Sequence, residues 1–222
     1  MLEKLRERLQ AHRPYRLAEA YPQAAVLLPI VARPEPTLLF TQRTAHLAQH
    51  AGQVAFPGGK REPEDRDLLA TALRESHEEI ALEGEQVDII GRLSDVMSLH
   101  GLRVTPFVGL IAPDLPLQAE PGEIAAIFEV PLRYFIDDRR SHTDVIPVDD
   151  RSWYVPSYPY EDRVIWGLSA MMLVELLAVG FDSDIALDRK PTQGELRYHP
   201  QRRRQPTPRS YPEPDASGKA SN

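Results

Sequence analysis

The feature of this sequence that most constrains its fold is a helix predicted over residues 66–82. Leu69, Leu73, Ser76 and Ile80 recur at spacings of four, three and four, which places them on one stripe that faces a core. Gly84 follows as the expected end of the helix. A helix with a single such stripe has to bury it against another layer of structure.

The rest of the chain supplies a sheet for that layer. Strands are predicted at 24–32, 37–42, 87–94, 103–111 and 124–130, with a hairpin of 143–148 and 151–155 around Asp149-Asp150. Two further helices are expected over residues 2–12 and 165–180, and the second is apolar on most sides. This pattern predicts an α/β fold, in which helices cover both faces of a mixed sheet.

The 222 residues are enough for one substantial domain with a core. We expect residues 1–20 to form the N-terminal helix and a lead-in, and residues 21–188 to form the domain. From residue 189 the composition turns to Pro, Arg, Ser and Gly with few apolar residues, so 189–222 is predicted to be a disordered tail.

Charge and composition exclude several classes of function. A formal net charge of −7 argues against bulk nucleic-acid binding, which needs a basic face. A small anionic substrate stays compatible with it, because a bound divalent cation inverts the local charge. The absence of cysteine excludes disulfides and thiolate sites. No stretch has the form of a signal peptide or a membrane span, so we expect a cytoplasmic protein without a membrane partner.

Three acidic residues cluster toward the end of the predicted helix. At 100° per residue, Glu75, Glu78 and Glu79 lie within about 100° of one another, away from the apolar stripe. Like charges at these spacings cost roughly 0.2–0.5 kcal/mol per pair. Carboxylates in the last turn also face the negative pole of the helix. A cation would offset both penalties, and oxygen ligands suit Mg²⁺ or Mn²⁺. The alternative is a solvated acidic face.

Residues around this cluster could support a site. Arg74 could hold one of the carboxylates through paired hydrogen bonds. Just before the helix, Phe56-Pro57-Gly58-Gly59 forms a loop whose backbone can approach closely and present amides to a phosphate.

Taken together, this segment resembles the Nudix box, the signature of a family of diphosphate hydrolases. The matching residues are Gly59, Arg74, Glu75, Glu78, Glu79 and Leu82. The departures are Asp65 in place of Glu, one extra residue between it and Arg74, Ser76 in place of an apolar residue, and Ala81 in place of Gly. The resemblance implies an α/β/α sandwich, with Glu75, Glu78 and Glu79 as metal ligands and Arg74 as their structural partner.

The segment upstream of the box is similar to a second motif, found in the coenzyme A diphosphatase branch of the family. It comprises Leu38 to Thr44 and Gly52 to Gly59. The resemblance implies substrate binding by Arg43, Gly58 and Gly59, although Arg43 could instead be structural. Ala48 is a departure, because the branch has an arginine at this position, and its loss would remove a phosphate contact.

The expected reaction is attack of water on a phosphorus of a diphosphate, with a metal neutralising charge on the oxygens. Nudix enzymes often take the general base from a loop downstream of the box. Here that loop holds Glu120 and Glu123, and Glu123 is favoured because it lies closer to the following strand. A box glutamate such as Glu79 is the alternative base.

Coenzyme A is the leading substrate, with 3′,5′-ADP and 4′-phosphopantetheine as products. The rivals are a diphosphatase for ADP-ribose or a dinucleotide, and a non-catalytic domain that senses a nucleotide. An aromatic-rich stretch contains Trp153, Tyr154, Tyr158, Tyr160 and Trp166. Core packing or a contact in a homodimer is favoured for it over stacking on adenine.

Overall fold

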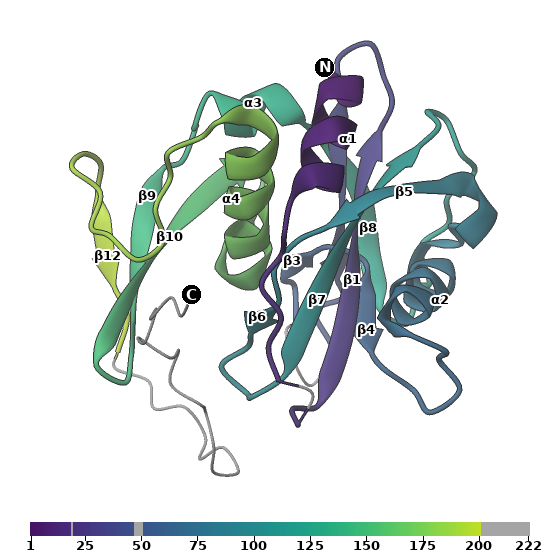
Figure 1. The fold of residues 1–222 in the computed structure, drawn as a ribbon, viewed down its shortest axis with the longest axis horizontal. Helices are drawn as coiled ribbons and strands as arrows, with labels where there is room; N and C mark the ends of the chain where they lie inside the picture. Colours follow the sequence, from purple (N-terminus) through teal and green to yellow (C-terminus); the bar gives the residue numbers. More distant parts are fainter. Residues whose placement is uncertain (19, 47–50, 201–222) are drawn as a thin grey trace, which may run out of the picture.

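The computed structural model describes residues 1–18, 20–46 and 51–200, and it has the predicted layered α/β arrangement. Figure 1 shows α2 (Leu68–Ile80) on one face of the main sheet, and α1 (Leu2–Ala11) and α4 (Gly167–Phe181) on the other. A second sheet lies on the far side of α4. The predicted sandwich of helices about a mixed sheet is confirmed, and the second sheet is an addition to it.

The main sheet is organised around β1 (Gln23–Val31). This strand runs parallel to β7 (Arg103–Ile111) and antiparallel to β2 (Thr37–Arg43) and β4 (Gly58–Lys60). The outer strands are β3 (Val54–Ala55), β5 (Val87–Arg92), β6 (Val96–Met97) and β8 (Ile124–Pro131). One parallel pair among antiparallel pairs makes the sheet mixed, as the sequence predicts.

The apolar run of β1 is buried because both faces of this strand are covered. Ala25 and Leu27 belong to the core beneath α2, whereas Leu28 and Ile30 belong to the core beneath α1 and α4. Alternate side chains of a strand point to opposite faces, so one continuous apolar segment supplies both cores. The strand thereby fixes the two helical layers relative to each other.

Helix α2 begins and ends with well-defined caps. Asp67 accepts a hydrogen bond from the amide of Ala70 at 2.8 Å and caps the N-terminus. Ala81 ends the helix in the left-handed conformation, with φ of 54°. Glycine adopts that conformation without a steric cost, which explains why the resembling pattern has glycine where this chain has Ala81. Gly84, the predicted end, lies in the following 3₁₀ turn, Gly84–Gln86.

The buried face of α2 differs from the predicted stripe. Ala72, Ser76 and Ile80 are fully buried, whereas Leu69 and Leu73 are only half-buried. The hydroxyl of Ser76 donates to the carbonyl of Ala72 at 2.7 Å, so its polar group is satisfied within the helix. Compared with the predicted stripe, the buried face is shifted around the helix and includes Glu79, which therefore lies on the sheet side.

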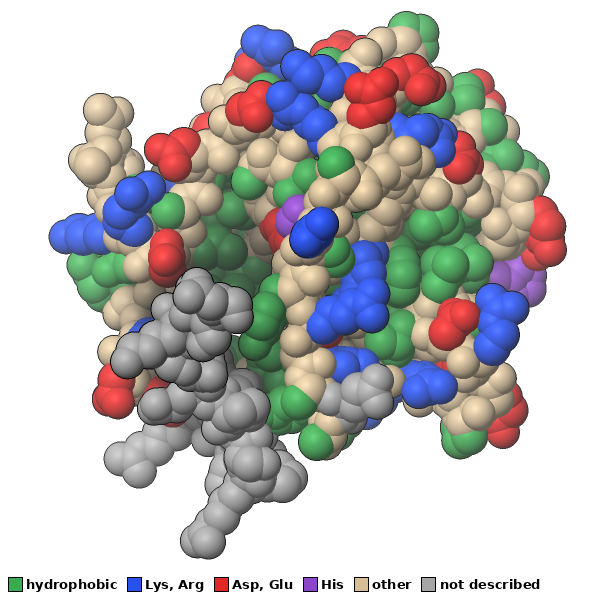
Figure 2. Space-filling view, viewed as in Figure 1, with side chains coloured by type: hydrophobic (Ala, Val, Ile, Leu, Met, Phe, Trp, Pro, Cys, Tyr) green, Lys and Arg blue, Asp and Glu red, His purple; other side chains and the backbone are tan. Residues whose placement is uncertain are grey.

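Ion pairs link α1 both to the sheet and to α4. Arg6 of α1 pairs with Asp88 of β5, and Arg8 pairs with Asp182 at the end of α4. Figure 2 shows acidic and basic side chains lying next to one another over this upper part of the face. None of the helices within the described residues is long and apolar enough to cross a membrane.

The second sheet contains the predicted hairpin. β9 (His142–Val148) and β10 (Arg151–Tyr160) pair across Asp149-Asp150, and β11 (Arg163–Ile165) extends the sheet. The short helix α3 (Leu132–Ile136) packs beside α4. Two of the predicted aromatic residues pack within the chain: Tyr158 is fully buried and meets Phe135 edge to face at 5.2 Å, and Tyr160 packs against the same core.

The predicted tail is partly ordered, which corrects the expectation of disorder from residue 189 onward. Leu196–Tyr198 forms β12, which pairs in parallel with β9. The Nε2 of His199 lies 2.7 Å from the buried carboxylate of Asp144. Backbone pairing and this polar contact hold a segment that has few apolar residues of its own. Residues 201–222 lie outside the described part of the chain.

Candidate active site

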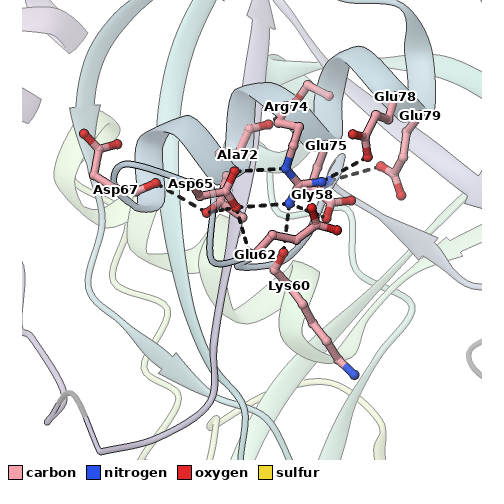
Figure 3. Close-up of polar contacts among 12 residues, drawn as sticks. Gly58, Lys60, Glu62, Asp65, Asp67, Ala72, Arg74, Glu75, Glu78 and Glu79 are labelled. Carbon is pink, nitrogen blue, oxygen red and sulfur yellow. Dashed lines mark hydrogen bonds and ion pairs between the residues drawn. The ribbon is translucent and has the colours of Figure 1, made fainter.

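The three glutamates of the box lie along α2 but in different surroundings. Glu78 is exposed, Glu75 is half-buried, and only 6% of Glu79 is accessible. Figure 3 shows the side chains of Glu78 and Glu79 projecting from the end of the helix. The sequence predicts three carboxylates on one face, and the structure divides them between two arginines.

Arg74 holds two of these glutamates and a third carboxylate that the motif does not assign to it. Its Nη1 donates to Glu78 at 3.0 Å, and its Nη2 lies 3.1 Å from Glu75. Its Nε and Nη2 both donate to the buried carboxylate of Asp65, at 3.0 and 3.1 Å. Figure 3 shows the guanidinium between Asp65 on one side and Glu78 on the other. The paired hydrogen bonds of Arg74 therefore go to Asp65, and they fix the guanidinium beside the box glutamates.

Asp65 lies before the helix and ties the preceding loop to it. Its carboxylate also accepts hydrogen bonds from the amide of Glu62 and the hydroxyl of Thr71, both at 2.9 Å. These contacts favour the charged form, and the hydrogen bond from Arg74 contributes most to holding the pKa of Asp65 at about 2. Because Asp65 lies outside α2, an extra residue in this loop does not rotate the helix.

The Asp65–Arg74 contact makes a prediction about stability at low pH. The pKa of Asp65 is lower in the folded chain than its ordinary value of 3.8, so its contribution is complete above about pH 4 and is lost as the pH falls toward 2. We expect Asp65→Asn to lose about 2 kcal/mol of unfolding free energy at pH 7. Its unfolding free energy should also fall less steeply than that of the parent between about pH 4 and 2.

Urea unfolding at a series of pH values measures both effects. Asp184→Asn removes an exposed carboxylate that lies 3.5 Å from Arg189, and it should behave like the parent. An Asp65→Asn variant with parental stability at pH 7 would show that the buried contact is not a net stabilising one.

Glu79 is the most deeply buried carboxylate of the group. Its Oε2 accepts a hydrogen bond from the amide of Gly58 at 3.0 Å, and its Oε1 lies 3.4 Å from the Nη1 of Arg43. Burial raises the pKa of Glu79 to about 7, against the opposing effects of Gly58 and Arg43, and the charges of Glu75 and Glu123 raise it further. The single positive charge of Arg43 therefore does not balance the negative charges of Glu79 and its neighbours Glu75 and Glu123.

The two glycines before the helix are required by close approach. Gly58 has φ of +151°, and a Cβ there would lie 2.3 Å from the carbonyl oxygen of Ala25. A Cβ on Gly59 would lie 2.3 Å from the Oε2 of Glu75. The loop thus leaves the Glu75 carboxylate in a space that any larger residue would fill. The amide of Gly58 is used by Glu79, so phosphate binding by these glycines stays a prediction.

The downstream loop docks on the end of α2. The amide of Glu120 donates to the carbonyl oxygen of Glu79 at 2.9 Å, and Gln118 binds the carbonyl of Ile80 in the same way. The carboxylate of Glu123 lies 3.5 Å from the Nη2 of Arg43 and is half exposed. The structure therefore brings Glu123 to the group around Glu79, whereas the exposed carboxylate of Glu120 lies near Gly122.

A divalent cation fits the charges of this group. Two arginines face the five carboxylates of Asp65, Glu75, Glu78, Glu79 and Glu123. Within residues 1–18, 20–46 and 51–200, no three acidic or histidine side chains are arranged as they stand to hold a metal ion. The three predicted ligands are thus not brought together into one ligand set, because each faces an arginine. The excess negative charge and the space kept by Gly59 suit a cation of the Mg²⁺ type.

Some of these relations had no clear signal in the sequence. In the sequence, Asp65 looks only like a conservative replacement of the glutamate in the motif. Its pairing with Arg74 depends on how the loop folds, which the sequence pattern does not reveal. The pairing of Arg43 with Glu79 and Glu123 joins three segments distant in sequence. Ala48, the departure from the branch motif, lies outside the described residues.

The chain is similar in sequence to known proteins over most of its length. The NUDIX domain profile matches residues 21–147. Nudix hydrolase NudL of Photorhabdus laumondii is 44% identical over 163 residues, which cover 73% of this chain and 87% of that protein. NudL of Yersinia pestis is 45% identical over 154 residues, which cover 69% of this chain and 77% of that protein.

Solved structures of lower similarity were also found. The Nudix hydrolase RenU from M. smegmatis aligns with a TM-score of 0.45 and 24% identity, over 53% of this chain and 74% of that one. An Ap4A hydrolase binary complex from C. elegans aligns with a TM-score of 0.44 and 20% identity, over 51% of this chain and 83% of that one.

Proposed function

The chain belongs to the Nudix family of hydrolases, and on that basis we propose that it cleaves the diphosphate of coenzyme A with the help of Mg²⁺ or Mn²⁺. Members of this family hydrolyse pyrophosphate bonds in small nucleotide-containing molecules. The products would be 3′,5′-ADP and 4′-phosphopantetheine.

The observation that supports a catalytic role best is the environment of Glu79. A carboxylate with 6% exposure lies between a loop amide and Arg43, with Glu75 and Glu123 close enough to raise its pKa. A buried carboxylate beside other carboxylates destabilises a fold when its charge is not fully paired, and a bound cation would offset that cost. A domain that only bound a nucleotide would have no need to retain this arrangement, which favours an enzyme over the non-catalytic alternative.

The proposed mechanism assigns a role to each side chain. Glu75, Glu78 and Glu79 would hold the cation, and Arg74, which contacts Glu75 and Glu78, would keep these two carboxylates beside it. When bound, the cation neutralises charge on the phosphate oxygens and makes water a better nucleophile. Glu123 would take a proton from the attacking water as the water oxygen bonds to one phosphorus. The bond from that phosphorus to the bridging oxygen breaks, and the bridging oxygen leaves on the other phosphate. Arg43, Gly58 and Gly59 contact the diphosphate.

The choice of coenzyme A rests on the upstream motif. Leu38 to Thr44 forms β2 and its end, and Gly52 to Gly59 runs through β3 and the loop into β4. This motif therefore lies directly beside the box, where the diphosphate would bind. Diphosphates such as ADP-ribose and diadenosine compounds are the rival substrates, because they present the same bond.

A substrate panel tests the proposal. With Mg²⁺ or Mn²⁺ present, we expect kcat/KM for coenzyme A to exceed that for ADP-ribose and for diadenosine tetraphosphate by at least about tenfold, a difference of about 1.4 kcal/mol in transition-state binding. Mass spectrometry should identify 3′,5′-ADP and 4′-phosphopantetheine as products. Equal or lower kcat/KM for coenzyme A would reject it as the preferred substrate, and binding of any of these compounds without cleavage would reject the hydrolase.

A further inference from the structure

The two arginines of the site are held very differently. Arg74 makes hydrogen bonds or ion pairs of 3.0–3.1 Å to three carboxylates and donates to the carbonyl of Lys60 at 3.0 Å. Arg43 lies 3.4 Å from Glu79 and 3.5 Å from Glu123, at the limit of hydrogen-bond distance. Its Nε is buried and has no hydrogen-bond partner within the described residues. Arg74 is fixed in place, and Arg43 is held loosely.

The backbone explains how Arg43 reaches these two carboxylates. It is the last residue of β2, and the register between β2 and β8 shifts between Gln42 and Arg43. An irregularity of this kind bends a strand and changes the direction of a side chain, often beside an active site. Here it places the guanidinium between Glu79 of α2 and Glu123 of the loop that precedes β8.

Arg43 therefore supplies positive charge to the same carboxylate that would bind a divalent cation. Glu79 has two oxygens; Oε2 is taken by the amide of Gly58, and Oε1 faces Arg43. A cation bound at Oε1 and the guanidinium beside it would repel each other. A quarter of the Arg43 side chain and half of the Glu123 side chain are exposed, so Arg43 can move toward solvent, away from Glu79.

We propose that Arg43 is the internal counter-ion of the metal-free site, which pairs with Glu79 until a divalent cation displaces it. On displacement, the guanidinium remains near Glu123 and becomes available to the substrate diphosphate. Arg43 is thus a positioning residue in the metal-free protein, and it lowers the apparent affinity for metal. This inference rests on the proposed function, since it requires that Glu79 is a metal ligand.

Metal binding without substrate tests this directly. Mn²⁺ binding to the full chain is measured from the free-ion EPR signal and by titration calorimetry, for the parent, Arg43→Gln, Arg43→Lys and Arg33→Gln. Removing the competing charge should make Arg43→Gln bind Mn²⁺ about tenfold more tightly than the parent. Arg43→Lys keeps the charge and should stay within about threefold of the parent.

Arg33→Gln is the matched control, because it removes the same charge from the turn between β1 and β2, where Arg33 pairs with Glu129 and Asp114. It should bind Mn²⁺ like the parent. Unchanged or weaker binding by Arg43→Gln would overturn the proposal. If the parent hydrolyses coenzyme A and binds Mn²⁺ while Arg43→Gln gains no affinity, only this inference fails. If the parent neither binds Mn²⁺ nor cleaves any diphosphate, the proposed function fails as well.

The parent protein provides a second measurement if Arg43→Gln does not fold. In a ¹⁵N NMR titration with Mg²⁺, the Nε–H signal of Arg43, assigned by its loss in Arg43→Lys, should shift as the guanidinium leaves Glu79. The corresponding signal of Arg74 should change much less, since its Nε stays bound to Asp65. An Arg43 signal that stays constant through metal saturation would contradict the displacement.

Discussion

Glu79→Gln is expected to lower kcat for diphosphate hydrolysis at least ~100-fold, with no loss of stability. Glutamine has nearly the same shape, and its side-chain oxygen can still accept the hydrogen bond from Gly58. It removes the negative charge, however, and with it the attraction for a cation. Because burial disfavours the charged carboxylate, the neutral side chain should leave the unfolding free energy equal to or above that of the parent.

Steady-state kinetics at saturating Mg²⁺ and thermal unfolding check the two parts of this prediction. Glu78→Gln should also lower kcat at least ~100-fold if all three glutamates hold the cation. Glu83→Gln is the control. Glu83 is exposed, lies just beyond the end of the same helix, and pairs with His77. A folded Glu79→Gln protein with near-parental kcat would show that this carboxylate is not part of the metal site.

Glu123→Gln should lower kcat about 100-fold or more, with a smaller change in KM. General-base catalysis contributes typically about 10²–10⁴ in rate, and Glu123 is the loop carboxylate that lies next to the Arg43–Glu79 pair. The acidic limb of the pH–kcat profile should flatten in the same variant, since the group that must lose its proton is gone. Initial rates over a range of substrate concentrations, at a series of pH values, give kcat, KM and the pH–kcat profile.

Glu120→Gln is the matched comparison within the same loop. Its backbone amide docks on the carbonyl of Glu79, but its side chain is exposed and lies over Gly122, so kcat should change little. If Glu120→Gln and Glu123→Gln both keep the parental kcat and acidic limb, the base does not come from this loop. It would then have to be a glutamate of α2, with Glu79 the first choice.

Local patterns predicted the main elements because those elements are defined by their own periodicity. The prediction for residues 103–111 coincides with β7, and the prediction for 24–32 differs from β1 by one residue at each end. The second sheet could not be predicted from such patterns. Although its hairpin has a local signal, the pairing of β12 with β9 joins residues about fifty positions apart in sequence.

The candidate site shows the same limit. A helical projection correctly places Glu75, Glu78 and Glu79 within one arc of α2. It gives no information about which neighbour each carboxylate meets, so the burial of Glu79 was not predicted. Leu69 and Leu73 suggested a core face opposite the glutamates, whereas the buried face includes Ala72, Ser76 and Glu79, and Glu79 accepts a hydrogen bond from Gly58.

The pairing of β12 with β9 has a consequence for aggregation. A β-strand at the edge of a sheet offers unpaired amide and carbonyl groups to strands of other molecules. β12 covers that edge of β9, and it is itself only three residues long, which makes it a poor template for further pairing. A chain shortened before Leu196 would uncover β9 and favour self-association. The folded unit therefore includes β12, although β12 lies in the segment from residue 189 that was predicted from its composition to be disordered.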